Sequence, residues 1–359
     1  MRAASTVLRG CLLGIALLSG LFWHLPAADG AASTTIALVV NKNLKPLIQA
    51  NLDLYVSDIT AEGYAPVIRE WDMAQSDQDT PSELRDYLKT ISNLKGAVFI
   101  GDLPVQNYES TNDWYGGYAL FPYDLYFMDL SITWLDQDSD GYVDGPASSG
   151  ISPTIWISRI KSSGINVFSG KTEADLANRY FEKIHRFRTG ELWLPDRALL
   201  WADDDWNNYD PASTFGTCYP DATRVTSAMP GITTDKTDWT SRWRQPYETE
   251  FFMCHSSETL HNPGPYVYSA DMAAADVCRL FWNCWNCSSA KYTATDHIAG
   301  VRLYTPRYGL TAVGSTKTGS MYGGVTAFYN YLGEGNSFGE AFQRWFATYY
   351  YDLLWHRGM

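Results

Sequence analysis

Short apolar strands alternate with amphipathic helices at the start of the chain, and this order restricts the possible fold more than any other feature. Three strands and two helices are expected in turn, at 34–40, 46–64, 65–71, 80–91 and 96–101. Thr80 as N-cap and Pro81 at the first helical position mark the start of the second helix. Strand–helix–strand–helix–strand order predicts a parallel sheet covered by helices on both faces.

After an irregular acidic stretch, one more strand and helix complete the first set, and a second alternating set begins at residue 197. Further strands are expected at 153–160, 197–203, 250–256, 278–287 and 309–316. Further helices are expected at 172–190, 238–246, 269–275 and 338–354. A boundary near 190–196 divides the chain into an N-terminal subdomain (33–192) and a C-terminal catalytic subdomain (193–359). We therefore predict an α/β protein of two adjacent subdomains, each with a mainly parallel sheet covered by helices.

The first 32 residues have the layout of a secretory signal peptide. Arg2 and Arg9 precede an apolar run at 11–22, and small residues then offer cleavage between Ala28 and Ala32. An uncleaved anchor is the alternative, but twelve apolar residues fall short of the roughly 20 that a spanning helix needs. No second span is evident, so we expect a secreted, periplasmic or cell-surface protein.

Composition narrows the function classes. Loss of Arg2, Arg9 and Asp29 with the leader changes the net charge from −13 to −14, which disfavours nucleic acid as a partner. Aromatic residues make up 15% of the chain, as expected for a packed globular protein. Five of the six cysteines remain after the leader, and an odd number in an exported protein leaves at least one thiol free or paired between chains.

Two of the later strands run into side chains suited to thiol chemistry. "EFFMC" is followed by His255, and "RLFWNCWNC" ends at Cys287. Reacting groups in parallel α/β sheets gather beyond the carboxyl ends of the strands, so adjacent strands would bring these two residues side by side. A thiol next to an imidazole is suited to acyl transfer, with Cys287 as nucleophile and His255 as general acid and base. Backbone N–H groups in the serine-containing turns that follow would hold the oxyanion.

Other interpretations of these residues remain open. His255 at a strand end is also compatible with a packed core residue. Cys284 competes as nucleophile, but strand periodicity places it within the sheet, whereas Cys287 lies past its end. "CWNC" has thiol–disulfide spacing, and Cys254, His255, Cys284 and Cys287 are a conceivable zinc set. A redox motif of this kind normally opens a helix after an early strand, which favours the dyad.

Several short motifs follow one another in order: "GDLPV" (101–105), "FPYDLYFMDL" (121–130), "DQDSDGYVDG" (136–145), "PTIWISRI" (153–160), the runs before the histidine and the cysteine, and "LTAVGSTKTGSM" (310–321). This order resembles the gingipain-like cysteine peptidases over roughly residues 34–345. The resemblance implies a caspase-like fold and a Cys/His dyad at Cys287 and His255. It also implies protein or peptide substrates. The chain departs from the family at Ser256, where a glycine usually follows the histidine.

The acidic motif "DQDSDG" has the spacing of a calcium loop. Carboxylates alternate, Gly141 follows where the loop must turn, and the bidentate Glu of the twelfth position is replaced by Ala147. The expected calcium ligands are Asp136, Asp138, Asp140, Tyr142 (through its carbonyl) and Asp144. Four carboxylates in nine residues repel one another without a cation, although a solvated acidic turn is the alternative. Its place between the two sets suggests a structural clamp.

Two further features bear on function. An acidic run follows a strand at the catalytic end and consists of Asp203, Asp204 and Asp205. This run is expected to bind a cation or a basic group of the substrate, or to be a solvated loop. Lys317 lies just past the last strand, where a caspase-like fold shapes a substrate pocket.

The leading hypothesis is an exported, calcium-stabilised cysteine endopeptidase. The rival is a non-catalytic binding protein of the same fold, favoured by Ser256 and by the lack of an obvious propeptide.

Overall fold

The computed structural model describes residues 34–113, 117–148, 150–206, 211–220, 225–228, 234–319 and 324–349. The predicted signal peptide (1–32) and the end of the predicted last helix lie outside these ranges. Across the ranges that are described, no helix combines the length and the apolar character needed to cross a membrane.

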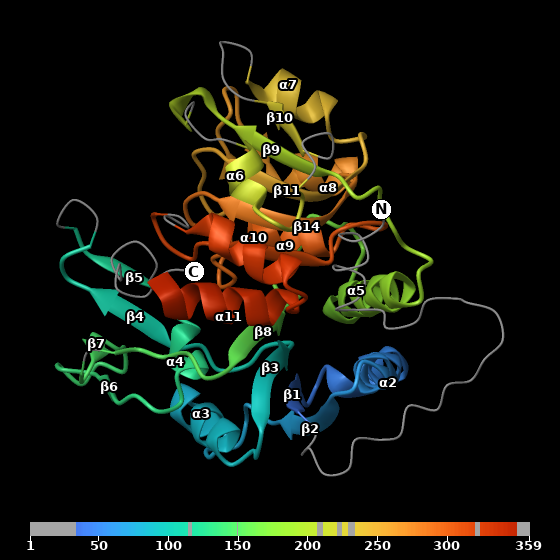
Figure 1. Cartoon of the computed structure of the whole chain (residues 1–359). Helices are drawn as coiled ribbons and strands as arrows, with labels where there is room; N and C mark the ends of the chain where they lie inside the picture. Colours follow the sequence, from blue (N-terminus) through green and yellow to red (C-terminus); the bar gives the residue numbers. More distant parts are fainter. Residues whose placement is uncertain are drawn as a thin grey trace.

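Four parallel strands form the sheet of the N-terminal half, in the order β2-β1-β3-β8. They are β1 (Thr35–Asn41), β2 (Ala65–Trp71), β3 (Leu94–Ile100) and β8 (Trp156–Ile160), and α2 (Lys45–Ala61) and α3 (Pro81–Lys89) connect the first three. Thr80 caps α3 as predicted, because its hydroxyl accepts the N–H of Glu83 while the Glu83 carboxylate accepts the N–H of Thr80. The predicted parallel sheet is confirmed (Figure 1).

An insertion between β3 and β8 carries two small antiparallel hairpins that the sequence pattern did not predict. It contains β4 (Asn107–Ser110), β5 (Ala119–Pro122), α4 (Leu125–Met128), β6 (Trp134–Leu135) and β7 (Gly145–Pro146). Figure 1 shows these hairpins together at one side of the molecule. Strands of two to four residues are too short to show a period, so this region was predicted only as an irregular acidic stretch.

Five parallel strands form the second sheet, in the order β10-β9-β11-β14-β15. They are β9 (Ala198–Ala202), β10 (Val225–Ala228), β11 (Tyr247–Met253), β14 (Arg279–Trp285) and β15 (Thr311–Gly314). The strands that precede His255 and Cys287 are therefore parallel neighbours, as predicted. Every residue of β11 and β14 is buried, as expected for central strands covered on both faces.

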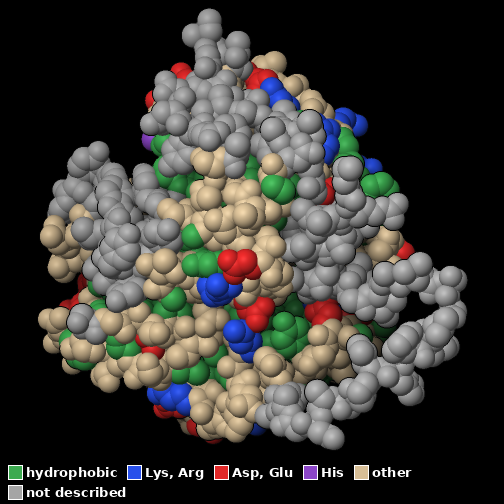
Figure 2. Space-filling model, in the orientation of Figure 1, with side chains coloured by type: hydrophobic (Ala, Val, Ile, Leu, Met, Phe, Trp, Pro, Cys, Tyr) green, Lys and Arg blue, Asp and Glu red, His purple; other side chains and the backbone are tan. Residues whose placement is uncertain are grey.

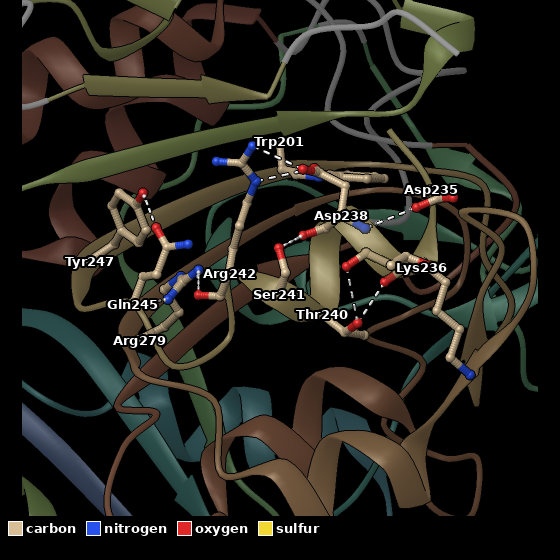
Figure 3. A network of polar contacts seen from close by, with 11 residues as sticks. Trp201, Asp235, Lys236, Asp238, Thr240, Ser241, Arg242, Gln245, Tyr247 and Arg279 are labelled. Atoms are coloured by element: carbon tan, nitrogen blue, oxygen red, sulfur yellow. Dashed lines mark hydrogen bonds and ion pairs between the residues drawn. The ribbon is translucent and has the colours of Figure 1, made fainter. Parts of the chain in front are cut away.

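Further helices and two short strands complete the structure, with α5 (Glu173–Arg188) in the N-terminal half and the others in the C-terminal half. These others are η2 (Asp204–Trp206), α6 (Pro211–Phe215), α7 (Lys236–Ser241), β12 (Leu260–His261), β13 (Val267–Tyr268), α8 (Ser269–Ala275), α9 (Ile298–Leu303), α10 (Val325–Gly333) and α11 (Phe338–Tyr349). The helix predicted at 238–246 is shorter than expected, because the chain must turn before β11 begins. Figure 3 shows the polar network at this turn, where Asp238 accepts hydrogen bonds from Trp201 Nε1 (2.9 Å) and from the Arg242 guanidinium.

The two halves pack as one body. Each of two hydrophobic cores takes residues from both sheets: Val39 shares a core with Phe251, and Leu38 shares the other with Trp282. The last helix also crosses between the halves, since Gln343 of α11 donates to the carbonyl of Pro153 before β8 (2.9 Å). A cavity of about 340 Å³ lies where the β8 and β15 edges face each other. On the face drawn in Figure 2, the described acidic and basic side chains form small mixed groups.

Candidate active site

Sheet register places His255 and Cys287 at the same edge of the C-terminal sheet. Met253 pairs with Trp285 at the end of β11 and β14, and His255 and Cys287 each lie two residues beyond that pair. The loops are joined directly, because the Ser256 hydroxyl donates to the carbonyl of Cys287. The residue that departs from the family pattern thus links the two loops that carry the predicted dyad.

Cys287 and Cys284 occupy different environments. Cys287 is partly buried, and its Sγ accepts the backbone N–H of Gly319 at 3.4 Å. Cys284 is fully buried within β14, as its position in the strand predicted, and the Arg302 guanidinium donates to its sulfur. Burial raises the pKa of the Cys284 thiol. Only Cys287 among the described cysteines lies partly open to solvent, so it is the thiol that a substrate can approach.

His255 is held from its outer side by two residues of η2. Its Nε2 lies 3.1 Å from Asp205 Oδ2, and the ring of Trp206 lies 4.9 Å from the imidazole, centroid to centroid. Trp206 in turn packs on Trp285 at 5.8 Å. The His255 side chain is 57% exposed and therefore is not a core residue.

Asp205 was predicted to belong to a site for a cation or a basic substrate group, or to a solvated loop, and its contact with His255 was missed. The order of the strands in the sheet could have predicted this contact. β9 is the other neighbour of β11, with Ala202 opposite Met253, so the residues that follow both strands meet at one edge.

Asp203, at the start of the acidic run, is buried and paired with a thiol. The Cys254 thiol lies 3.7 Å from Asp203 Oδ2, and the N–H of Asp204 donates to Oδ1 at 2.8 Å. Burial raises the pKa of Asp203 to about 6 and, as the largest effect, raises that of Cys254 well above its usual value. Asp203 therefore belongs to the support of the site and does not face a ligand.

The alternative zinc set is not assembled in the described part of the chain. Cys254 and Cys284 have the separate partners described above, and groups of three possible metal ligands occur there only among acidic residues. All five cysteines within the described ranges are free thiols.

Two of the turn N–H groups predicted for an oxyanion are already engaged. The N–H of Ser257 donates to the carbonyl of Leu260 (3.0 Å), and the N–H of Ser288 donates to the carbonyl of Lys317 (2.7 Å). Ser288 reaches this geometry with a φ of 53°. An oxyanion site therefore has to use other N–H groups of these loops.

The predicted calcium loop connects β6 and β7. Carboxylate oxygens of Asp136, Asp138 and Asp144 lie within 4.8 Å of one another, and those of Glu109, Asp138 and Asp140 form a second such group. The N–H of Tyr142 donates to Asp140 Oδ1 at 2.9 Å.

Glu109 belongs to β4. It lies far from the loop 136–144 in the sequence, so its place in the acidic cluster was not predicted. The loop packs against that strand, with Gln106 Nε2 donating to the carbonyl of Gly141 at 3.0 Å. Val143 also forms a bridge to Tyr108. The loop is therefore anchored within the N-terminal half, which corrects the expectation of a clamp between the two halves.

Comparisons with known proteins agree with this architecture. The chain is similar to the complex of the RgpB pro- and mature domains of Porphyromonas gingivalis (11% identity, 89% of this chain and 75% of that one, TM-score 0.64). It is also similar to the Arg-specific cysteine proteinase gingipain R (12% identity, 90% and 74%, TM-score 0.63). A third solved structure, described as a protease, matches at 14% identity over 86% of this chain and 66% of that one (TM-score 0.57).

No family model and no curated protein sequence matches the chain. The predicted resemblance is thus confirmed at the level of the fold. The chain has the gingipain and caspase-like architecture, with two parallel sheets flanked by helices.

Proposed function

We propose that this chain is an exported cysteine endopeptidase in which Cys287 is the nucleophile and His255 the general acid and base. The observation that carries the proposal is the register of β11 and β14, which sets both residues two positions beyond one paired rung. Ligand and reaction sites in parallel α/β sheets lie at this edge. The fold, shared with cysteine proteinases, agrees with this assignment.

The chemistry follows from the two side chains. His255 takes the proton of the Cys287 thiol, the sulfur attacks the scissile carbonyl carbon, and protonated His255 then gives that proton to the leaving amine as the C–N bond breaks. The product is a thioester on Cys287. Water, activated by neutral His255, then attacks the thioester carbonyl, which releases the acid and restores the thiol.

The developing oxyanion needs N–H donors close to the nucleophile. The N–H groups of Ser257 and Ser288 are committed elsewhere, whereas those of Ser256 and Cys287 lie in the two loops next to the dyad. Both belong to residues joined by the contact from the Ser256 hydroxyl to the Cys287 carbonyl. We assign the oxyanion site to this pair, since backbone N–H groups fixed in place before reaction stabilise the transition state most effectively.

Asp205 acts as the positioning residue for His255. Its carboxylate holds Nε2, which leaves Nδ1 to exchange protons with Cys287 and the leaving group. Trp206 restricts the ring from one face. The arrangement has the logic of other nucleophile–base–orienter sites, in which the third group fixes the tautomer and orientation of the histidine.

A structural calcium ion is the second part of the proposal. The ion would be held by Asp136, Asp138, Asp140 and Asp144 together with the carbonyl of Tyr142, and we propose Glu109 as a further ligand. Two groups of three carboxylates share Asp138, and within each group the oxygens lie within 4.8 Å of one another, which suits a hard cation that prefers oxygen ligands. The ion would stabilise the hairpins of the insertion and takes no part in bond cleavage.

Export and peptide substrates complete the proposal. The leader predicted at 1–32 and the acidic net charge of −13 suit an exported protein that does not bind nucleic acid. The rival function is a binding protein that retains the fold without turnover. The contact from Ser256 to Cys287 favours it, because this side chain occupies part of the space between the two loops.

Hydrolysis of a peptide library by the purified mature protein tests the proposal. Cys287→Ala and His255→Ala should lose cleavage, whereas Cys284→Ala, at a buried thiol of the same strand, should retain it. His185→Ala is the matched histidine control, because this partly exposed side chain also pairs with an aspartate, Asp58 at 3.0 Å. Tight peptide binding without any cleavage by the unmodified protein would support the rival instead.

A further inference from the structure

A buried ion pair joins the insertion of the N-terminal half to the loop beside the nucleophile. Lys317 Nζ lies 3.1 Å from Asp113 Oδ2, and the two side chains are 1% and 5% exposed. Asp113 follows β4, whereas Lys317 follows β15. The pair therefore connects a short hairpin of one half to the catalytic edge of the other.

The segment 315–319 runs directly along the Cys287 loop. The N–H of Ser288 donates to the carbonyl of Lys317 at 2.7 Å, and the N–H of Ala290 donates to the carbonyl of Ser315 at 3.0 Å. The N–H of Gly319 points at Cys287 Sγ, 3.4 Å away. Gly319 has a φ of 117°, which other residues rarely adopt, so this N–H direction depends on glycine.

The hairpin holds the same segment at two more points. The Thr316 hydroxyl donates to the carbonyl of Pro122 in β5 at 2.7 Å. The Lys317 ammonium also lies 5.8 Å from the ring centroid of Phe121 and donates to the carbonyl of Thr318 at 2.5 Å. These contacts fix the lysine side chain and, through it, the backbone that leads to Gly319.

Burial of this ion pair carries a desolvation free energy that opposes folding. Both charges are removed from water, and Asp113 Oδ1 is buried without a hydrogen-bond partner among the described residues. Buried pairs of this kind are often no more stabilising than apolar residues of similar volume. Stability alone therefore does not account for the pair, and its place beside Cys287 points to the site.

We propose that Asp113 and Lys317 are positioning residues for the nucleophile, and that their ion pair holds the Gly319 N–H against the sulfur of Cys287. A hydrogen bond from this N–H fixes the position of the sulfur and directs it toward the loop that carries His255. The inference rests on the proposed function for the role of Cys287. It adds that the N-terminal half, through Asp113, controls the reactivity of a residue in the C-terminal half.

The test measures alkylation of Cys287 by iodoacetamide across a pH series, with mass spectrometry of the labelled peptide. The charged groups around the sulfur are Lys317 from the segment after β15, Asp113 from the β4–β5 hairpin, and His255 with Asp205 from the loops after β11 and β9. Lys317→Met and Asp113→Asn should slow alkylation about tenfold at pH 7, with slower labelling than the natural protein throughout the series, because the Gly319 N–H no longer fixes the sulfur.

A double variant separates positioning from folding. Asp113→Leu combined with Lys317→Met leaves no unpaired buried charge and should fold at least as well as the natural protein, yet alkylate Cys287 as slowly as the single variants. Lys95→Met is the matched control, since Lys95 forms another ion pair between the halves, with Glu340 at 3.5 Å, away from the site.

A natural rate and pH profile in any folded variant of Asp113 or Lys317 overturns the inference. An equal effect in Lys95→Met would also overturn it. Alkylation requires no peptide hydrolysis, so a natural protein that labels at Cys287 but cleaves no peptide would refute the proposed function without deciding the role of the ion pair.

Discussion

Removal of Arg279 should destabilise the protein severely, because this residue neutralises a carboxylate at the centre of the sheet that carries the site. Its Nε lies 2.6 Å from Glu250 Oε2, and both side chains are fully buried. Figure 3 shows Arg279 beside the turn that precedes β11, where its guanidinium also donates to the carbonyls of Gln245 (2.7 Å) and Arg242 (3.2 Å). The pair thus ties the start of β14 to the middle of β11.

The magnitude follows from what the substitution leaves behind. In Arg279→Met, Glu250 keeps the N–H of Trp239 (2.8 Å) but becomes a buried carboxylate with no ion-pair partner among the described residues. Breaking a buried pair from one side costs about 3–5 kcal/mol. A domain of this kind is stable by only about 5–15 kcal/mol in total. Replacing both residues together, Arg279→Met with Glu250→Leu, should cost far less, since no unpaired charge remains.

Urea denaturation followed by tryptophan fluorescence measures these values. The expected free energy of unfolding falls by about 3–5 kcal/mol in Arg279→Met and by clearly less in the double variant. Arg307→Met is a suitable control, because its ion pair with Asp276 involves a side chain that is 66% exposed and should contribute at most about 1 kcal/mol. Equal losses for Arg279→Met and Arg307→Met would refute the reasoning.

Three further predictions follow from the site and its surroundings. Asp138 belongs to both acidic groups, so calcium should raise the melting temperature of the natural protein but not that of Asp138→Asn. Asp77→Asn, at an exposed aspartate outside both groups, should behave like the natural protein, and an unchanged melting temperature after chelation would contradict the calcium proposal. The pKa of Asp203 is raised to about 6, so its contribution to stability is present below about pH 4 and is lost as the pH rises through 6. In denaturation series, the free energy of unfolding of the natural protein should fall by on the order of 1–3 kcal/mol relative to Asp203→Asn between pH 4 and 7. A difference between the two proteins that stays constant with pH would contradict this prediction. Asp205→Asn should lower kcat about tenfold, because the ring of His255 loses the carboxylate that orients it; an unchanged kcat would remove Asp205 from the mechanism.

The main sheets were predictable because their signals are local and long. Strands such as β1 and β11 are continuous apolar runs, and Thr80 with Pro81 marks a helix start whatever surrounds it. The parallel pairing of β11 and β14 then followed from the rules for α/β sheets, and it brought the His255 and Cys287 loops together.

Contacts between distant segments were not predictable from the same signals. Asp205 and His255 meet only because β9 and β11 are neighbours, and an exposed aspartate has no sequence feature that names its partner. Glu109 joined the acidic loop through a hairpin too short to show a period. Lys317 was located near the site, but nothing in its surroundings in the sequence pointed to Asp113.

The central claim is that Cys287 is the nucleophile, and labelling by an electrophilic peptide probe tests it most directly. The purified mature protein is incubated with a peptide chloromethyl ketone or acyloxymethyl ketone library, and the modified residue is located by mass spectrometry. The account predicts labelling at Cys287 that depends on His255 and is absent at buried Cys284. Labelling at Cys284, or labelling of Cys287 that is unaffected by His255→Ala, would contradict it.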